Sequence, residues 1–496
     1  MEEKFTDQEL ARREKLAKYK ELGVDPFGQK FERSDLIKDV REKCAGKSNE
    51  ELEANKVYVT IAGRIMSLRR MGKASFMNIK DVTGNMQVYM GIDVVGEETY
   101  NLFKLADLGD IVGVYGRVML TRTGEMTIRA EKYTHLTKSL RPLPEKYHGL
   151  TDVEERYRHR YVDLIMNDDS MKVALARPKI IRAMQNYFDS LGFVEVETSV
   201  LSPILGGAAA RPFVTHHNSL DKDFYLRIAT ELPLKKLLVG GMEKVYEIGR
   251  LFRNEGMDTK HNPEFTTVEL YQAYGDLQDM RHIAEGVFKE VAQKVCGTLQ
   301  IPYGEGTLDL SKPFRWVSMV EVVKEATGID FSKDISYEEA VALAKKHGIK
   351  VEKHWTSVGF ILNAFFDEKC DPYLQEPTFV HSYPIEVSPL TKKLPNDPRY
   401  TDRFELFIGG MEYGNAYSEL NDPIDQKERF VAQLEAKKLG DEEASEMDTD
   451  FLEALEYGMP PAGGIGIGID RFVMLMTNQT SIREVILFPC MRDSNK

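Results

Sequence analysis

The chain has 496 residues, of which 42% are hydrophobic, so its length and composition predict two or three globular domains and exclude a disordered or repetitive protein. Its formal net charge of −13 argues against a protein that coats nucleic acid over its whole surface, but does not exclude a local basic site. The sequence has no run of about 18 apolar residues, no apolar leader and no CxxC pair among its four cysteines, which predicts a cytoplasmic protein without a membrane partner, disulfides or a zinc site.

The first predicted element is a helix over residues 6–22. Thr6 and Glu9 have the spacing of a capping box, and Gly23 suits the end of the helix. The helix carries five cations, Arg12, Arg13, Lys15, Lys18 and Lys20. The pattern favours a solvated amphipathic helix, with an RNA-contacting face as the alternative. We assign residues 1–56 to an N-terminal helical extension.

Residues 57–140 change character and contain short alternating runs separated by glycine or Asp/Asn turns, at 57–61, 76–79, 86–90, 111–114 and 126–130. Five short strands in about 80 residues predict a small antiparallel barrel, most simply an OB-fold. This segment has 11 Lys+Arg against 8 Asp+Glu, whereas the whole chain is acidic. A basic barrel face with an exposed aromatic such as Phe76 is typical of single-stranded nucleic-acid binding. A barrel that serves only for packing is the alternative.

Residues 141–176, with two prolines and a charged run, predict a linker to a larger domain over residues 177–496. That domain opens with a helix that Gly192 ends, followed by a strand that ends before Pro203. One face of the helix is apolar and carries Ile180, Ile181, Met184, Tyr187, Phe188 and Leu191. By itself, this helix and strand fit a plain core as well as a subunit interface.

A predicted hairpin between residues 245 and 273 is more informative. Its first strand runs over 245–253, a polar loop with His261 follows, and the second strand runs over 265–273. Alternation places Arg253 and Glu255 on one face, and on the returning strand it groups Phe265, Thr267, Glu269 and Tyr271. Buried charges are unfavourable unless they are matched, so this hairpin predicts a ligand with a phosphate, an aromatic base and a cation. A structural salt-bridge hairpin is the alternative.

A second predicted hairpin spans residues 404–413, with Gly409-Gly410 as its turn. In that register, Glu405 and Glu412 are diagonal neighbours on one face, which predicts a shared cation and, near phosphates, Mg²⁺. Asn415 and Glu419 then have the opposite parity, and we expect a bulge at Gly414 to turn them towards the same pocket. Exposed hairpin carboxylates without a ligand are the alternative.

Near the C-terminal end, Gly464, Gly466 and Gly468 alternate before Asp470-Arg471 and an apolar helix over residues 472–476. Alternate glycines leave one strand face without side chains, so a flat ligand can lie on the backbone. Arg471 opens the helix, a position that favours a phosphate. The run does not match GxGxxG in a βαβ unit and no GxxxxGK[ST] occurs, which disfavours Rossmann and P-loop proteins.

With these residues in view, the chain resembles class II aminoacyl-tRNA synthetases, and within them the bacterial lysyl-tRNA synthetases. The helix and strand up to Pro203, residues 252–265 and residues 464–471 are similar to the three motifs of the class, in their order. The stretches 206–213 and 414–423 resemble the lysine-specific members, with Tyr417 at a Phe-like position. The resemblance covers nearly the whole chain. It implies an α+β fold, in which an OB-fold barrel precedes a mainly antiparallel sheet of six or seven strands flanked by helices.

The same resemblance implies a two-step ligase reaction. L-Lysine is activated by ATP with Mg²⁺ to lysyl-adenylate and pyrophosphate, and the lysyl group then passes to the terminal ribose of tRNA(Lys). Because little covalent chemistry falls to the protein, we expect it to act by positioning and by neutralising charge. The resemblance also implies a homodimer, in which the segment from Arg177 to Pro203 packs against its counterpart.

Site residues follow from the resemblance, position by position. Arg253 and Arg471 are implied as the catalytic arginines. Lysine binding is implied for Gly207, Glu231, Arg253, Glu269, Tyr271, Asn415, Tyr417 and Glu419. ATP binding is implied for Arg253, Glu255, His261, Asn262, Phe265, Glu405, Glu412 and Arg471, with Glu405 and Glu412 on the metal. Anticodon recognition is implied for Arg69, Phe76 and Gln87. No chemistry is assigned to residues 276–400 or 425–460.

Three alternatives remain. The first is aspartate or asparagine as the amino acid, which the carboxylates Glu231, Glu269 and Glu419 disfavour because they suit a cationic side chain. The second is an inactive RNA-binding or regulatory paralogue, which could have lost Arg253, Arg471 and the paired glutamates. The third is a related enzyme that lysylates a translation factor, whose members lack the N-terminal barrel.

Overall fold

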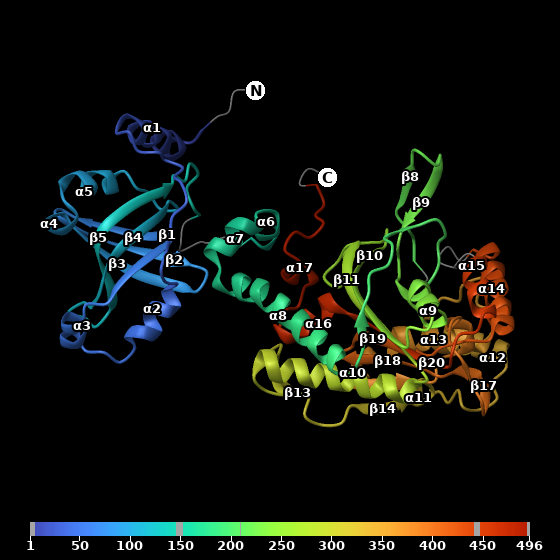
Figure 1. The fold of residues 1–496 in the computed structure, drawn as a ribbon. Coiled ribbons are helices and arrows are strands. Elements are labelled where there is room, and N and C mark those ends of the chain that lie inside the picture. Colours follow the sequence, from blue (N-terminus) through green and yellow to red (C-terminus); the bar gives the residue numbers. More distant parts are fainter. Residues whose placement is uncertain (1–4, 145–151, 209, 441–446, 494–496) are drawn as a thin grey trace. The chain divides into compact units, whose positions relative to one another are not determined.

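The computed structural model describes residues 5–144, 152–208, 210–440 and 447–493. The chain divides into two compact units, residues 1–149 and residues 150–496, and each is considered by itself (Figure 1). Ala209, in the stretch 206–213 noted above, lies outside the described residues. Within these described ranges, no helix is long and apolar enough to cross a bilayer.

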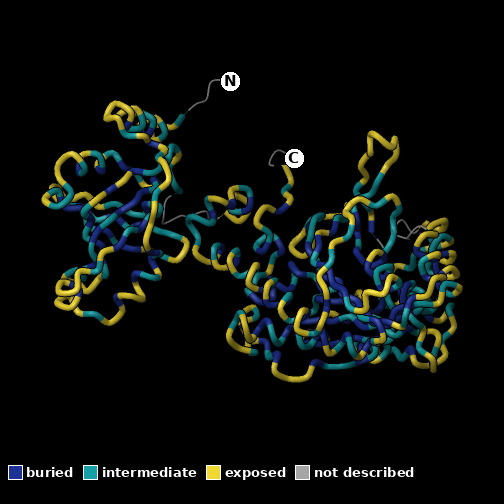
Figure 2. Tube along the Cα trace, viewed as in Figure 1, coloured by how far each residue is buried: buried dark blue, intermediate teal, exposed yellow. Residues whose placement is uncertain are grey.

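The first unit is a closed five-stranded barrel with short helices, which confirms the predicted OB-type barrel. Its strands run in the order β1-β2-β3-β5-β4. They are β1 (Tyr58–Met71), β2 (Ala74–Asp81), β3 (Gly84–Gly91), β4 (Ile111–Leu120) and β5 (Met126–Thr137). The helices are α1 (Asp7–Glu21), α2 (Ile37–Cys44), α3 (Asn49–Asn55), α4 (Ile92–Val95) and α5 (Glu97–Lys104). Alternate strand residues fill the barrel interior and are buried, among them Val59, Ile61, Ile79, Val88, Val114 and Ile128 (Figure 2).

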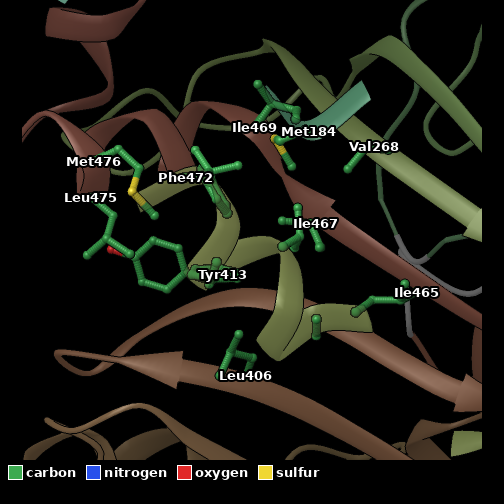
Figure 3. Close-up of a cluster of buried hydrophobic side chains, with 14 of the residues drawn as sticks. Met184, Val268, Leu406, Tyr413, Ile465, Ile467, Ile469, Phe472, Leu475 and Met476 are labelled. Atoms are coloured by element: carbon green, nitrogen blue, oxygen red, sulfur yellow. The ribbon is translucent and has the colours of Figure 1, made fainter. Parts of the chain in front are cut away.

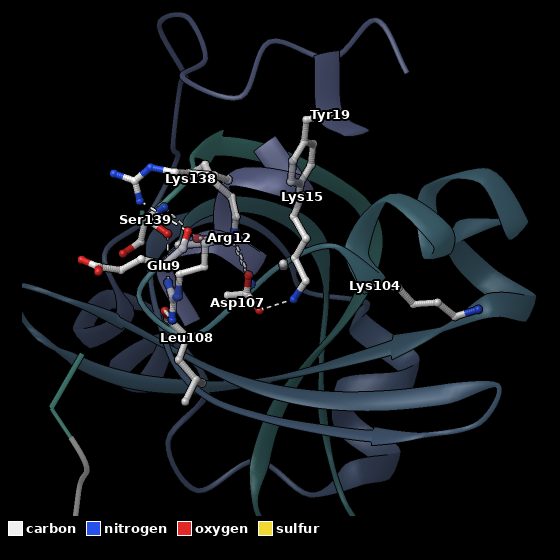
Figure 4. Close-up of polar contacts among 12 residues, drawn as sticks. Glu9, Arg12, Lys15, Tyr19, Lys104, Asp107, Leu108, Lys138 and Ser139 are labelled. Carbon is white, nitrogen blue, oxygen red and sulfur yellow. Dashed lines mark hydrogen bonds and ion pairs between the residues drawn. The ribbon is translucent and has the colours of Figure 1, made fainter. Parts of the chain in front are cut away.

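Helix α1 begins with the predicted capping box and is held against the barrel by polar contacts (Figure 4). Arg12 is buried and donates to the backbone oxygens of Leu108 and Ser139, at 2.9 Å each. Lys15 Nζ lies 2.5 Å from Asp107 Oδ1. Arg12 and Lys15 therefore anchor α1 to the rest of this unit.

The second unit begins with helices where the sequence predicted a linker. Residues from 153 onward form α6 (Val153–Arg158), α7 (Arg160–Met166) and α8 (Asp168–Ser190), so the long helix starts earlier than expected. The charged run there is not solvated throughout. Arg160 is buried, lies 2.6 Å from Asp163, and donates to the backbone oxygens of Arg483 and Leu487. These tertiary partners explain why a charged stretch is part of a folded domain.

The second unit is built on one large sheet with the strand order β14-β15-β18-β19-β20-β11-β10-β6. Its strands are β6 (Val194–Glu195), β10 (Lys244–Phe252), β11 (Glu264–Ala273), β14 (Arg315–Ser318), β15 (Thr378–His381), β18 (Arg403–Ile408), β19 (Met411–Ser418) and β20 (Ala462–Gly468). Pairing is antiparallel except at the two edges, where β14 pairs with β15 and β10 with β6 in parallel. The sheet has eight strands instead of six or seven because the two-residue strand β6 extends one edge.

Helices and small sheets surround the large sheet. The helices are α9 (Glu231–Val239), α10 (Leu277–Val291), α11 (Met319–Thr327), α12 (Tyr337–Lys346), α13 (Val358–Lys369), α14 (Pro423–Lys438), α15 (Thr449–Glu456), α16 (Ile469–Met476) and α17 (Ile482–Val485). Short strands elsewhere are β7 (Leu201–Ser202), β8 (Val214–His217), β9 (Lys222–Leu226), β12 (Gln300–Tyr303), β13 (Gly306–Asp309), β16 (Lys393–Leu394) and β17 (Asp397–Thr401). Three short helical turns are η1 (Ala292–Cys296), η2 (Asp371–Tyr373) and η3 (Ile385–Val387).

The main core of this unit lies where α8, α10 and α16 pack on the sheet (Figure 3). Met184 and Phe188 of α8 are buried in this core, whereas Ile181 is only half-buried. Most of the apolar face noted in the sequence is therefore used within the chain. Exposed apolar side chains of the same segment are Leu175, Val194, Val200 and Leu201.

Candidate active site

A cavity of about 750 Å³ lies over strands β11, β18, β19 and β20 of the large sheet. Such a volume suits one or two small-molecule ligands. All but one of the pocket residues named from the sequence line this cavity. They are Gly207, Glu231, Arg253, Glu255, His261, Asn262, Phe265, Glu269, Tyr271, Glu405, Glu412, Asn415, Tyr417 and Arg471. Glu419 does not line it and is fully buried next to the cavity wall.

The hairpin of β10 and β11 has the predicted strands and alternation. Leu251 lies opposite Phe265, and Arg253 directly follows the first strand. The Arg253 guanidinium carbon lies 5.2 Å from the centre of the Phe265 ring. Arg253 Nε is buried and has no hydrogen-bond acceptor among the described residues. An aromatic face and an arginine with unused donors therefore meet at one end of the cavity, which suits a base and a phosphate.

Arg471 and His261 meet at the same end of the cavity. Arg471 Nη2 donates to His261 Nε2 at 3.2 Å, and His261 Nδ1 lies 2.9 Å from Asp258 Oδ2. Arg471 Nη1 donates to the backbone oxygen of Glu412 at 2.8 Å. The alternation of side chains along a strand could not predict this contact, because His261 belongs to a loop and Arg471 lies in the first turn of α16.

Asp470 fixes the start of α16. Its carboxylate accepts hydrogen bonds from Arg177 Nη1 at 2.5 Å and from the backbone N–H of Thr266 at 2.7 Å. These contacts tie the helix that carries Arg471 to α8 and to β11. The backbone next to Arg471 is therefore held in place by these two contacts.

The hairpin of β18 and β19 has the two-residue glycine turn that the sequence predicts. Gly409 and Gly410 both have positive φ, 61° and 68°, which other residues rarely adopt. The pairing shifts between Leu406 and Phe407, so an extra residue is inserted just before Gly414. As a result, Glu405 lies opposite Asn415. The expected bulge is confirmed, and it places Asn415 on the cavity face beside Glu405.

Arg403 is a cavity residue that the sequence analysis missed. Its Nη2 lies 2.5 Å from Glu405 Oε1, and its Nε donates to Asn415 Oδ1 at 3.0 Å. Tyr383 also donates to Glu405, at 2.8 Å. Burial raises the pKa of Glu405, Arg403 opposes that rise and Glu412 adds to it. Arg403 stands two residues before Glu405 on one strand, so the alternation used for the glutamates could have found it.

Glu405 and Glu412 fit a magnesium site of the kind that a nucleotide completes. Glu412 lies opposite Phe407, two residues from Glu405, so both carboxylates have the predicted diagonal placement. In the part of the chain that the structure describes, no group of three or more acidic, histidine or cysteine side chains could hold a metal by itself. Mg²⁺ is usually held by one or two carboxylates together with substrate phosphates and water. Two cavity carboxylates match that mode.

Acidic side chains gather at the opposite end of the cavity. Glu269 accepts hydrogen bonds from the Thr230 N–H and the Tyr271 hydroxyl, both at 3.3 Å. Burial, and then the charge of Glu231, raise the pKa of Glu269 to about 7. Glu231 accepts a hydrogen bond from the Tyr417 hydroxyl at 2.5 Å, so the tyrosine has a polar role that a phenylalanine would lack.

Glu419 and Lys235 form a buried ion pair beside these groups. Lys235 Nζ lies 2.5 Å from Glu419 Oε2 and 2.6 Å from Glu231 Oε1. Neither Glu419 oxygen accepts a well-aligned hydrogen bond within the described residues. Burial raises the pKa of Glu419, and the charge of Lys235 opposes that rise. The sequence analysis named Glu419 but missed Lys235, for which the Glu231-to-Lys235 helical spacing was the available signal.

The glycines of β20 form part of the cavity floor. A methyl group on Gly464 would fall within 3.0 Å of both Glu419 Oε1 and the Tyr271 ring. Added methyl groups at Gly466 and Gly468 would have their nearest neighbours at 3.5 Å and 3.9 Å. The floor is therefore filled by protein at Gly464 and open at the other two glycines, where a flat ligand can approach the backbone.

In the barrel unit, the three residues named for nucleic-acid contact lie on neighbouring strands. Arg69 is exposed and lies opposite Phe76 in the pairing of β1 with β2. Phe76 is half-buried, with its ring centre 5.3 Å from that of Tyr89. Gln87 accepts a hydrogen bond from Thr127 at 2.9 Å. Phe76 therefore keeps part of its ring accessible for stacking on an outer barrel face.

Segments without assigned chemistry also contribute to the cavity wall. Residues 276–400 supply Phe360, Asn363, Asp367, Tyr383, Glu386 and Thr391, and residues 425–460 supply Phe430 and Gln433. These segments carried no periodic or charge pattern that pointed to the cavity. Their contribution depends on the tertiary fold.

Comparisons with known proteins agree with this geometry. Residues 152–492 match the family described as tRNA synthetases class II (D, K and N), and residues 59–136 match the OB-fold nucleic acid binding domain. A lysine–tRNA ligase of Lysinibacillus sphaericus is 57% identical over 494 residues, covering 100% of this chain and 99% of its own length. Lysine–tRNA ligases of Streptococcus gordonii and Staphylococcus aureus are 56% and 55% identical, and at least 99% of every chain is covered.

Proposed function

The chain belongs to the lysine–tRNA ligases among the class II tRNA synthetases, and we propose that its cavity activates L-lysine with ATP and transfers it to tRNA(Lys). The observation that carries this proposal is the opposite character of the two cavity ends. Arg253, Phe265 and Arg471 meet at one end, and the carboxylates gather at the other. A nucleotide and a cationic amino acid are the ligands that these ends fit.

In the first step, a carboxylate oxygen of lysine attacks the α-phosphorus of ATP, and the bond to the leaving pyrophosphate breaks. Arg253 is suited to hold both reacting groups, because its planar guanidinium can bind the α-phosphate and the lysine carboxylate together. Phe265 stacks on the adenine, and Arg471 covers the other face of the ring and reaches the γ-phosphate. The protein accelerates this step by positioning and by opposing the negative charge that develops.

Other residues hold the nucleotide. Glu255 accepts a hydrogen bond from the adenine amino group, and His261 and Asn262 bind the phosphate tail. Glu405 and Glu412 would hold Mg²⁺, which when bound supplies positive charge against the phosphates. Arg403 keeps Glu405 and Asn415 in fixed orientations through its contacts at 2.5 Å and 3.0 Å.

The acidic end holds lysine. Gly207 and Glu231 receive the α-amino group, Asn415 the carboxylate, and Tyr417 orients Glu231 through its hydroxyl. The side-chain ammonium lies among three groups, Glu269, Tyr271 and Glu419. Glu419 supports this assignment because it is buried, its Oε2 pairs with Lys235, and its Oε1 has no hydrogen-bond partner among the described residues. A buried carboxylate oxygen without a donor is unfavourable in the empty site, and a second ammonium would stabilise it.

In the second step, a hydroxyl of the terminal ribose of tRNA attacks the lysyl carbonyl carbon, and AMP leaves. The barrel binds the anticodon of tRNA(Lys) on the face of Arg69, Phe76 and Gln87.

We place the reaction in the cytoplasm. All four cysteines are free, which is compatible with a reducing compartment.

We also propose that the protein is a homodimer. The exposed apolar side chains Leu175, Val194 and Leu201 belong to the segment of α8, β6 and β7, and a symmetric contact would cover them twice. Light scattering at micromolar concentration should give about twice the chain mass. An active monomer would contradict the dimer and leave the ligase assignment intact.

The decisive experiment for the ligase assignment is ATP–pyrophosphate exchange measured with each amino acid separately, followed by charging of tRNA(Lys). Lysine alone should support rapid exchange, because only a cationic side chain matches the carboxylates. Exchange with aspartate or asparagine and none with lysine would refute the assignment. An absence of exchange with every amino acid would favour an inactive paralogue.

A further inference from the structure

Lys235 stands out because a lysine in the middle of a surface helix is normally solvated, and this one is fully buried. Its ammonium lies 2.6 Å from Glu231 and 2.5 Å from Glu419. It also lies over two aromatic rings, 5.3 Å from the centre of Tyr417 and 6.0 Å from that of Phe451. A buried ammonium is unfavourable unless carboxylates pair with it, so this lysine and the two glutamates form one unit.

The neighbouring Lys236 shows what an ordinary lysine does on this helix. It pairs with Asp450 near the surface, where the Asp450 side chain is 73% exposed. Such pairs contribute little to stability. Both lysines suit a helix equally well, so helix propensity does not explain why Lys235 is buried and Lys236 is not. The contacts of Lys235 with the carboxylates at the acidic end of the cavity explain its burial.

We propose that Lys235 is the fixed counter-ion of the lysine pocket, a positioning residue that keeps Glu231 and Glu419 ionised for the incoming substrate. The inference rests on the proposed function. With Glu231, Glu269 and Glu419 ionised, Lys235 lowers the negative charge of the acidic end from three to two. Arg253, which under the proposed function holds the lysine carboxylate from the other end, leaves one net negative charge for the substrate. Free lysine has two ammonium groups and one carboxylate, which give one net positive charge. Lys235 thus sets the pocket charge to the value that one lysine molecule neutralises.

The groups around the Lys235 ammonium determine what its removal would do. Glu231 on its own helix, Glu419 after β19, and the rings of Tyr417 and Phe451 face it directly. Glu269 and Tyr271 on β11 interact with these carboxylates. Without the ammonium, the carboxylates repel one another in a buried site, and protons are the available replacement. A protonated Glu419 cannot form an ion pair with a substrate ammonium until its proton leaves. Lysine binding should then compete with protons.

The test compares full-length Lys235→Met with Lys236→Met, a matched change on the same helix. For Lys235→Met we expect the lysine KM at pH 7 to rise about tenfold or more, since each pH unit below a carboxylate pKa costs about a factor of ten in the ionised form. This KM should fall more steeply with rising pH than in the wild type, while the ATP KM changes little. Calorimetry in buffers of different ionisation enthalpy should show additional proton release when lysine binds. Lys236→Met should match the wild type in every measurement.

The outcomes separate this inference from its alternatives. A lysine KM raised equally at every pH, without additional proton release, would mean that Lys235 only supports the fold. A lower lysine KM would mean that Lys235 competes with substrate for Glu419, and either result overturns the inference. If Lys235→Met does not fold, the double variant with Glu419→Gln carries the test. It removes the ammonium together with one of its two carboxylates and leaves Glu231 without its counter-ion. It should therefore still release additional protons when lysine binds, and an absence of additional release would overturn the inference. Lysine-dependent exchange by the wild type tests the proposed function independently.

Discussion

Replacing Gly464 by alanine should weaken lysine binding and leave ATP binding almost unchanged. The added methyl group would fall within 3.0 Å of Glu419 Oε1 and of the Tyr271 ring. Neither neighbour can easily move, because Glu419 is fully buried against Lys235 and Tyr271 is buried in the cavity wall. The variant must therefore displace at least one group that the proposed function places around the lysine ammonium.

The size of the effect follows from the interaction that is lost. A hydrogen bond to a charged group contributes about 1.5–3 kcal/mol, which corresponds to roughly a ten- to hundredfold rise in the lysine KM. The assay is lysine-dependent ATP–pyrophosphate exchange, with the lysine and ATP KM values measured separately.

Gly468→Ala is the matched control for this experiment. Its nearest neighbour would be Arg471, at 3.9 Å, in the open part of the floor. This variant should raise the ATP KM and leave the lysine KM within about threefold, a shift of less than about 0.7 kcal/mol. Equal rises of both KM values in Gly464→Ala, or a loss of thermal stability with unchanged KM values, would refute the division of the floor into two ends.

Glu419→Gln should raise the lysine KM about ten- to hundredfold with little change for ATP, and a rise confined to ATP would move Glu419 to the nucleotide site. The wild-type lysine KM should fall as pH rises from about 6 to 8, because Glu269, whose pKa is about 7, must ionise; a flat profile would contradict this. Phe76→Ala should raise the KM for tRNA by the loss of about 1–3 kcal/mol of stacking and leave exchange intact, whereas equal losses would make Phe76 a core residue. Glu412→Gln should raise the Mg²⁺ concentration needed for half-maximal exchange, and an unchanged requirement would argue against this ligand.

The geometry of the cavity around Arg253, Phe265 and Glu405 could be predicted from the sequence because it depends on local rules. Strand alternation grouped the functional side chains of the first hairpin, and the Gly409-Gly410 turn set the register of the second. The bulge before Gly414 was also foreseen, since Asn415 had the wrong parity without it. Each of these features is determined by residues close together in the sequence.

The linker prediction failed for the opposite reason. The charged run that ends at Arg160 has the composition of a solvated connection, and the backbone oxygens that Arg160 binds, of Arg483 and Leu487, come from the far end of the chain. Lys235 and Arg403 were missed in the same way. Each has an ordinary spacing from a glutamate, and the second contact, to Glu419 or to Asn415, comes from another element.

Specificity at the acidic end is therefore a property of the tertiary structure. The carboxylates come from α9, β11 and the end of β19, and the cation that offsets them comes from α9. Counting acidic residues along the sequence indicates a cationic substrate. It overestimates the negative charge of the pocket, because the sequence alone would place Lys235 on the surface. What a substrate meets is the charge that remains after internal pairing. Under the proposed function, Arg253 binds the lysine carboxylate as a second cation, so one negative charge remains. That remainder matches the single net positive charge of lysine, so a closely packed group of glutamates can exist in a folded protein and still bind one cationic amino acid.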